Sequence, residues 1–124
     1  MKEAGVVINQ EGEPLYWHIP ANRTVASLPD SPDLWYDGFL ANIQMVAGFA
    51  HSHPGGGIPG PSWTDLETFA SVESALGRLD WWITSDEAVV LCQWVGPGRH
   101  AYQVRQLAVE PGWVAELRRV SQIT

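Results

Sequence analysis

The stretch of sequence that decides the fold is residues 45–65, which read MVAGFAHSHPGGGIPGPSWTD. The first six residues are apolar or glycine, and the run ends at Pro54, which predicts a mostly buried strand over residues 45–53. The next seven residues include four glycines and two prolines and predict a loop. Ser62 then offers a capping hydroxyl, with a carboxylate three positions later at Asp65. The apolar residues that follow predict a helix with a face made of Leu66, Phe69, Ala70, Leu76 and Leu79.

Other strands and helices are predicted on both sides of this stretch. A turn at residues 10–14 separates two strand-like runs, 5–9 and 15–19, and predicts a hairpin. A loop over residues 20–32 leads to a short helix that opens at 31–33. Further strands are expected at 81–84, 88–95 and 101–109, and Pro111 and Gly112 precede a closing amphipathic helix. The predicted class is α/β (α+β), a single domain over residues 1–124 with a mixed sheet and flanking helices.

Composition narrows the range of partners. The chain has 124 residues, with seven basic and fourteen acidic side chains and a formal net charge of −7. This charge disfavours nucleic acid and anionic membranes, which attract a basic surface. No lysine or arginine lies between Arg23 and Arg78, an interval that contains six acidic residues, so a cation is favoured there.

Cysteine usage and hydropathy bear on compartment and stability. The one cysteine, Cys92, excludes an internal disulfide and a cysteine-rich metal cluster. The apolar runs are too short to cross a bilayer, and the first residues lack an apolar signal region, so we expect a cytoplasmic protein. Large aromatic side chains are expected to fill the core, namely Trp17, Trp35, Trp81, Trp82, Trp94 and Trp113.

Three candidate metal-binding residues lie at or just after the end of the central predicted strand. Residues two apart on a strand point to the same side, so His51 and His53 present two imidazoles from one face. Asp65, in the first turn of the next helix, could supply a third ligand. Two nitrogens and one carboxylate leave an open position for water on a tetrahedral Zn²⁺, as in catalytic zinc sites. His18 and His100 are far from this motif in sequence and are expected to be structural or on the surface.

One motif resembles the signature of the JAMM (MPN-type) metallopeptidases, which are zinc hydrolases that cleave peptide or isopeptide bonds. It consists of His51-Ser52-His53-Pro54, a spacer of seven residues, and Ser62-Trp63-Thr64-Asp65. The resemblance implies that His51, His53 and Asp65 are zinc ligands and that Ser62 helps to hold the oxyanion. It also implies an upstream glutamate as general base. Glu3 is the candidate, because Glu3 to Ile8 is similar to the family's glutamate followed by an aliphatic strand.

Compact bacterial and phage tail-assembly members of that family are the most similar in pattern. They imply a protein or peptide substrate, such as a ubiquitin-like modifier or a tail protein. Gly55, Gly56 and Gly57 are expected to border the substrate channel, since glycine lets an extended peptide approach closely. The substrate, the type of amide bond and the oligomeric state stay open. A non-catalytic MPN-like interaction module and a non-haem iron oxygenase are the alternatives, which bound metal would distinguish.

Overall fold

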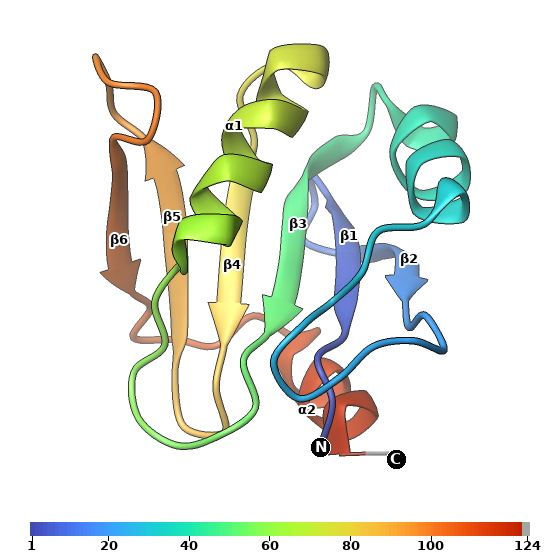
Figure 1. Ribbon diagram of the computed structural model, residues 1–124, viewed down its shortest axis with the longest axis vertical. Helices are drawn as coiled ribbons and strands as arrows, with labels where there is room; N and C mark the ends of the chain where they lie inside the picture. Colours follow the sequence, from blue (N-terminus) through green and yellow to red (C-terminus); the bar gives the residue numbers. More distant parts are fainter. Residues whose placement is uncertain (123–124) are drawn as a thin grey trace.

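The computed structural model describes residues 1–122, which fold around a mixed six-stranded sheet (Figure 1). The order across the sheet is β2-β1-β3-β4-β5-β6, and only β3 and β4 pair in parallel. Helix α1 makes the crossover between those two strands, as a parallel pair requires. The strands are β1 (Gly5–Asn9), β2 (Pro14–His18), β3 (Val46–Ser52), β4 (Asp80–Thr84), β5 (Val89–Trp94) and β6 (Tyr102–Gln106).

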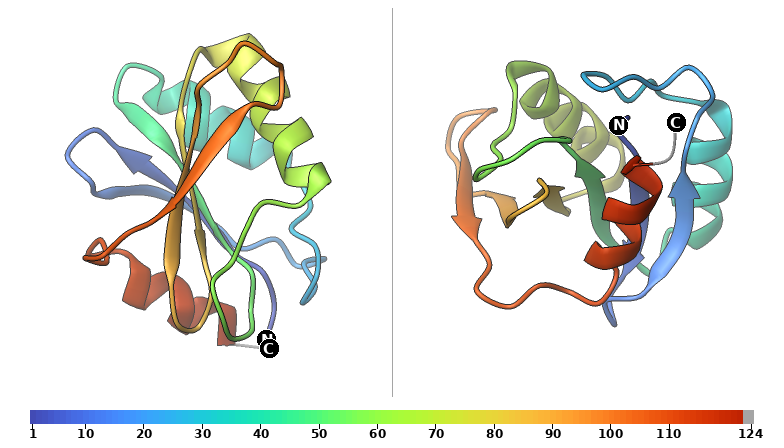
Figure 2. Two further views of the ribbon diagram at one scale, coloured as in Figure 1. Left: turned by 90° about the vertical axis from the view of Figure 1, so that its left-hand side faces the viewer. Right: turned by 90° about the horizontal axis from the view of Figure 1, so that it is seen from below.

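Helices cover both faces of the sheet (Figure 2). On one face lie α1 (Trp63–Leu76) and a short helical segment made of the π-helical turn η1 (Leu34–Phe39) and the 3₁₀ turn η2 (Leu40–Asn42). On the other face lies α2 (Val114–Gln122). Within residues 1–122 no helix combines the length and the apolar character needed to cross a membrane.

The alternation of side chains along the strands produces two cores. Val7 of β1 packs with the α1 and η1 side chains, whereas its neighbours Val6 and Ile8 pack with α2. Both sides of β1 are therefore apolar, as in a strand covered on both faces. Gly48 permits the parallel pairing of β3 with β4, because a Cβ at this position would lie 1.8 Å from the carbonyl oxygen of Asp80.

The predicted fold class, a mixed sheet with flanking helices, is confirmed, and the differences are at the ends of elements. Leu79 lies outside the helix that was predicted to carry it, because Gly77 ends α1 with a φ of +89°. The last strand covers Tyr102–Gln106 rather than residues 101–109. The tryptophan prediction holds for Trp81 and Trp113, which are buried. It holds in part for Trp17, Trp35 and Trp82, which are partly buried and pack against the cores. It is wrong for Trp94, which is half-buried and belongs to neither core, with the guanidinium of Arg78 over its ring at 3.7 Å from the centroid.

Candidate metal centre

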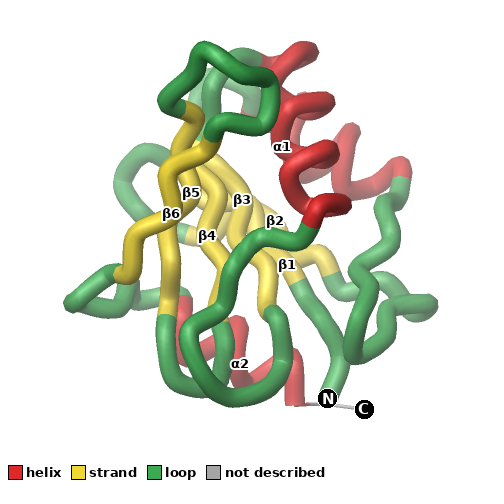
Figure 3. Tube along the Cα trace, turned by 60° about the vertical axis from the view of Figure 1, so that its left-hand side comes forward, coloured by secondary structure: helices red, strands yellow, loops and turns green. Residues whose placement is uncertain are grey.

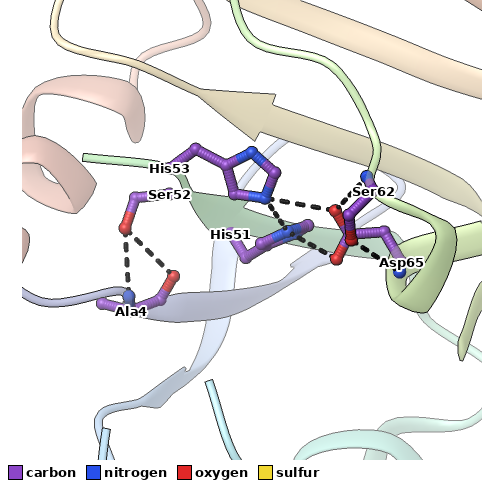
Figure 4. A network of polar contacts seen from close by, with 6 residues as sticks. All are labelled: Ala4, His51, Ser52, His53, Ser62 and Asp65. Atoms are coloured by element: carbon purple, nitrogen blue, oxygen red, sulfur yellow. Dashed lines mark hydrogen bonds and ion pairs between the residues drawn. The ribbon is translucent and has the colours of Figure 1, made fainter. Parts of the chain in front are cut away.

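Strand β3 presents the two histidines as its last residues pass into a loop. His51 pairs with Gly5 of β1 and Ile83 of β4, so its backbone is fixed from both sides. Both imidazoles project to the same side of the strand (Figure 4). Ser52, between them, points to the opposite side, where its hydroxyl accepts a hydrogen bond from the Ala4 amide at 3.0 Å. The alternation of a strand thus explains the His-Ser-His pattern.

The carboxylate of Asp65 meets both imidazoles. Its Oδ1 is 3.2 Å from Nε2 of His51, and its Oδ2 is 3.1 Å from Nε2 of His53. The two Nε2 atoms are 3.0 Å from each other. The structure therefore brings together the three residues that the sequence predicted to be ligands.

A capping box at the start of α1 orients Asp65. The Ser62 hydroxyl accepts a hydrogen bond from the Asp65 amide at 3.0 Å, and the Asp65 carboxylate accepts one from the Ser62 amide at 2.9 Å. These two bonds satisfy amides that a helix leaves unpaired in its first turn. Ser62 thus has a structural task as the N-cap, and its side chain also lines the cavity described below.

Glu3 approaches the same cluster from the segment before β1. A carboxylate oxygen of Glu3 and ring nitrogens of His51 and His53 all lie within 4.8 Å of one another. The residue is only 7% exposed. Burial raises the pKa of Glu3 above its ordinary value, against the opposing effect of the two histidines, and the negative charge of Asp65 adds to the rise. A carboxyl with a raised pKa is suited to taking up a proton near neutral pH.

The backbone around Glu3 is held on several sides. The Glu3 amide donates to the Thr24 carbonyl at 2.8 Å. Arg23 donates to the carbonyl of Glu3 at 3.1 Å and to that of Val120, near the end of α2, at 3.2 Å. The Lys2 amide donates to the carbonyl of Ser121 at 2.8 Å. Glu3 is therefore fixed by the loop after β2 and by α2 together.

Asp65 is electrostatically coupled to both histidines. Burial opposes ionisation of Asp65, but hydrogen bonds from His51 and His53 outweigh it and hold the pKa of this carboxyl far below its usual range. Burial likewise lowers the pKa of His53, and the hydrogen bond and charge of Asp65 outweigh that effect and raise it. Asp65 and the two histidines therefore stabilise one another through shared protons, which a bound metal ion would replace.

The candidate ligand atoms lie about as far apart as the ligand atoms of one shared metal ion. Zinc–nitrogen and zinc–oxygen bonds of about 2.0–2.1 Å at tetrahedral angles separate the ligand atoms by about 3.3–3.4 Å. The two Nε2 atoms are 3.0 Å apart, and each lies at a similar distance from one oxygen of Asp65, 3.2 Å from Oδ1 for His51 and 3.1 Å from Oδ2 for His53. A metal ion that replaced the protons shared by these groups, with both imidazoles protonated at Nδ1, would receive the lone pairs of the two Nε2 atoms and of the carboxylate. The site can therefore hold a metal ion.

A cavity of about 640 Å³ opens on the cluster. Glu3, His51, His53, Ser62 and Asp65 all line it, together with apolar side chains from the loop over residues 19–33, β3, α1 and β4. This volume lies within the range of about 300–1,000 Å³ that is typical of ligand pockets. The candidate centre is therefore accessible to a small molecule or to part of a peptide.

The three glycines after β3 do not line this cavity in the structure. Their loop runs past the end of β4 and the start of β5 toward α1 (Figure 3) and binds the turn between those strands. The carbonyl of Gly57 accepts a hydrogen bond from the Ser85 hydroxyl, and that of Gly55 accepts one from the Asp86 amide at 2.8 Å. A Cβ at Gly56 would lie 2.8 Å from a carboxylate oxygen of Glu87. The role of Gly55, Gly56 and Gly57 in substrate binding stays a prediction.

Sequence reasoning missed the parts of the site that come from the loop after β2. Arg23 braces Glu3, and residues 25–29 form a wall of the cavity. His18, at the end of β2, is buried and donates from Nε2 to the carbonyl of Pro29 at 2.7 Å, which agrees with a structural role. The sequence of this loop shows no hydrophobic periodicity, so it does not predict such contacts. The one available signal is that Arg23 is the last basic residue before the acidic interval that ends at Arg78.

The sequence was also compared with protein-family models and with curated proteins, and neither comparison finds a match.

Proposed function

We propose that this protein is a zinc-dependent hydrolase that cleaves a peptide or isopeptide bond, in the manner of the JAMM metallopeptidases that its motif resembles. The observation that carries the proposal is the convergence of His51, His53 and Asp65 at separations of 3.0–3.2 Å beside the buried carboxylate of Glu3. Two imidazoles and one carboxylate form a zinc ligand set that leaves a coordination position open.

The division of tasks between the two carboxylates follows from distance. Asp65 contacts both imidazoles directly, so it completes the ligand set. A carboxylate oxygen of Glu3 lies within 4.8 Å of the imidazole nitrogens, near enough to reach either the ion or a water bound to it, and we assign it to the water because Asp65 already completes the ligand set. Zinc, when bound, lowers the pKa of a coordinated water toward about 7 and polarises a carbonyl.

The side chains of this protein perform the remaining steps. Glu3 orients the attacking water and takes its proton, which its raised pKa favours. It then returns that proton to the leaving amine. Ser62, which lines the cavity, is positioned by its capping bond to donate its hydroxyl hydrogen to the developing oxyanion.

The proposed compartment is the reducing cytoplasm, which suits a chain whose one cysteine is buried and unpaired.

Three variants and the wild type test this function. Asp65→Asn and His53→Ala remove ligands, so they should lose both zinc and the cleavage of peptides. Glu3→Gln should keep about one equivalent of zinc, because the proposal assigns its carboxylate to the attacking water and not to the ion, and should lose turnover by at least about 10²-fold. Zinc is measured by elemental analysis and cleavage by mass spectrometry, with and without a chelator.

The same measurements separate the alternatives. Full turnover by zinc-loaded Glu3→Gln would assign the base to another residue. A wild-type protein that binds no metal and still binds a protein partner would be an interaction module. Bound iron with oxygen-dependent turnover would identify an oxygenase.

A further inference from the structure

We infer that the cavity beside the metal centre is a subsite for a large apolar side chain, so that the substrate is an uncharged stretch of polypeptide cut at an internal amide next to such a residue. This inference rests on the proposed function and adds the class of substrate. It joins four observations: the chemistry of the cavity walls, their rigidity, the position of the metal ligands and the charges present.

The inner wall of the cavity is aromatic. Phe49 of β3, Phe69 of α1 and Trp81 of β4 line it. The rings of Phe69 and Trp81 stack with their centroids 4.4 Å apart at an interplanar angle of 16°. The Trp81 ring nitrogen donates to Glu73 at 2.9 Å, which fixes the indole. Little of these rings meets solvent, so they form a packed apolar surface at the base of the cavity.

The outer wall is a loop that is tied down at both ends. Val25, Ala26, Leu28 and Pro29 face the cavity from this loop. At one end the Thr24 carbonyl accepts the Glu3 amide, and at the other the Pro29 carbonyl accepts a hydrogen bond from His18. Between them the Thr24 amide donates to the Ser27 carbonyl at 2.9 Å and closes a turn. A wall held in this way is preformed, which reduces the entropic cost of binding.

The position of the ligands sets where the apolar group of a substrate would lie. His51, His53 and Asp65 line the same cavity as the aromatic wall. The Phe49 and His51 rings are stacked, with centroids 6.5 Å apart and an interplanar angle of 20°. A scissile carbonyl at the metal centre therefore places an adjacent side chain against Phe49 and the loop wall. Burial of an aliphatic or aromatic side chain there is favourable.

The charges of the cavity disfavour an acidic occupant. Among the described residues that line the cavity there is no lysine or arginine, whereas Glu3 and Asp65 contribute two carboxylates. An acidic side chain, or the free carboxylate of a substrate's last residue, would have no basic side chain to pair with there. The charges therefore disfavour an acidic residue and a terminal carboxylate beside the cleaved bond, and the aromatic lining favours an apolar residue there over a basic one.

The preference is measured by digesting a mixture of blocked, randomised decapeptides with the zinc-loaded protein and sequencing the products by mass spectrometry. We expect leucine, isoleucine, valine, methionine or phenylalanine on one side of the cut bond, enriched about tenfold or more over glycine and aspartate. Equal cleavage beside glycine, or a preference for a charged residue at both positions, would overturn the inference.

A matched pair of variants locates the preference in the cavity. Val25 lines the cavity and is 54% exposed, and Val109 is 84% exposed and does not line it. Because neither side chain belongs to a core, Val25→Asp and Val109→Asp should both fold. Val25→Asp should reduce the apolar preference about tenfold, and Val109→Asp should leave it unchanged. The same loss in both variants, or in neither, contradicts the assignment.

Binding to the metal-free protein separates this inference from the proposed function. The probes are N-acetyl-leucine methylamide and N-acetyl-glycine methylamide, followed by NMR shifts of the Val25 and Leu28 methyl groups. Saturable shifts with the leucine probe and none with the glycine probe support the subsite. If such shifts occur but no peptide is cleaved, only the hydrolase proposal fails. A leucine probe that binds no better than the glycine probe overturns the subsite, whatever the outcome of the digestion.

Discussion

Glu3 and Glu73 are both buried, but their surroundings give them different tasks. Glu3 faces the histidine pair and an open cavity. Glu73, on α1, accepts hydrogen bonds from four donors and does not line the cavity beside the metal centre. Its partners are the side chains of Arg78, Trp81 and Tyr102 and the amide of Leu79. A fully satisfied carboxylate of this kind fixes the junction of α1 with β4.

Glu73→Gln should destabilise the protein, because an amide NH₂ would then face groups that are themselves donors. We expect a loss of about 1–3 kcal/mol in the free energy of unfolding, measured with urea. Glu67→Gln is the control, since the partly exposed Glu67 lies on the same helix and contacts His100, at 2.8 Å, and Arg99, at 3.7 Å. This substitution should cost less than about 1 kcal/mol. Equal losses in the two variants would contradict the role given to Glu73.

Ser62 carries two assignments that substitution can separate. Ser62→Ala should remove the cap and cost about 0.5–2 kcal/mol of stability. Ser62→Asn retains an N-cap oxygen without the hydroxyl, so its stability should return toward that of the wild type while its turnover stays low. If thermal denaturation and peptide cleavage recover together in Ser62→Asn, the residue acts only as a cap.

At the scale of elements, Arg23 joins three segments that are distant in sequence. It binds the carbonyls of Glu3, before β1, and of Val120, in α2. Arg23→Met should therefore loosen the segment that carries Glu3 and leave the β3 and α1 ligands in place. Hydrogen exchange should show faster exchange of the Glu3 and Ala4 amides with zinc content unchanged. Arg105→Met, at an exposed position of β6, is the control, and equal protection of these amides in both variants would contradict the brace.

The elements that the sequence predicted best are those with a local signal. The capping box at Ser62 and Asp65 located α1, and the apolar run before His51 located β3. Strand alternation was enough to predict that His51 and His53 share a side. The approach of Glu3 was predicted only through a family resemblance, because its position depends on the pairing of β1 with β3 and on contacts from α2. The cavity wall at residues 25–29 depends entirely on tertiary contacts, which no local pattern encodes.

At the scale of the whole molecule, His18 links stability to pH. Burial lowers its pKa below the ordinary value of 6.5, although its hydrogen bond to Pro29 and the charge of Asp30 oppose this. The unfolded chain therefore binds more protons than the folded protein just below pH 6.5, and the stability from this residue is lost as the pH falls through that range.

His18→Gln should remove this contribution. We expect the metal-free variant to lose less unfolding free energy than the wild type between pH 7.5 and pH 5.5, as measured by urea titration at each pH. The comparison uses the difference between the two proteins, so that the titration of the other histidines cancels. Parallel pH profiles would show that His18 is not held as a neutral donor in the folded state.

The central claim is that His51, His53 and Asp65 bind one zinc ion beside Glu3. An anomalous difference map recorded at the zinc absorption edge from crystals grown with equimolar zinc tests this claim most directly. The account predicts one peak, about 2.0–2.2 Å from both Nε2 atoms and from a carboxylate oxygen of Asp65. A peak bound to other residues, or no peak at this centre, would contradict it.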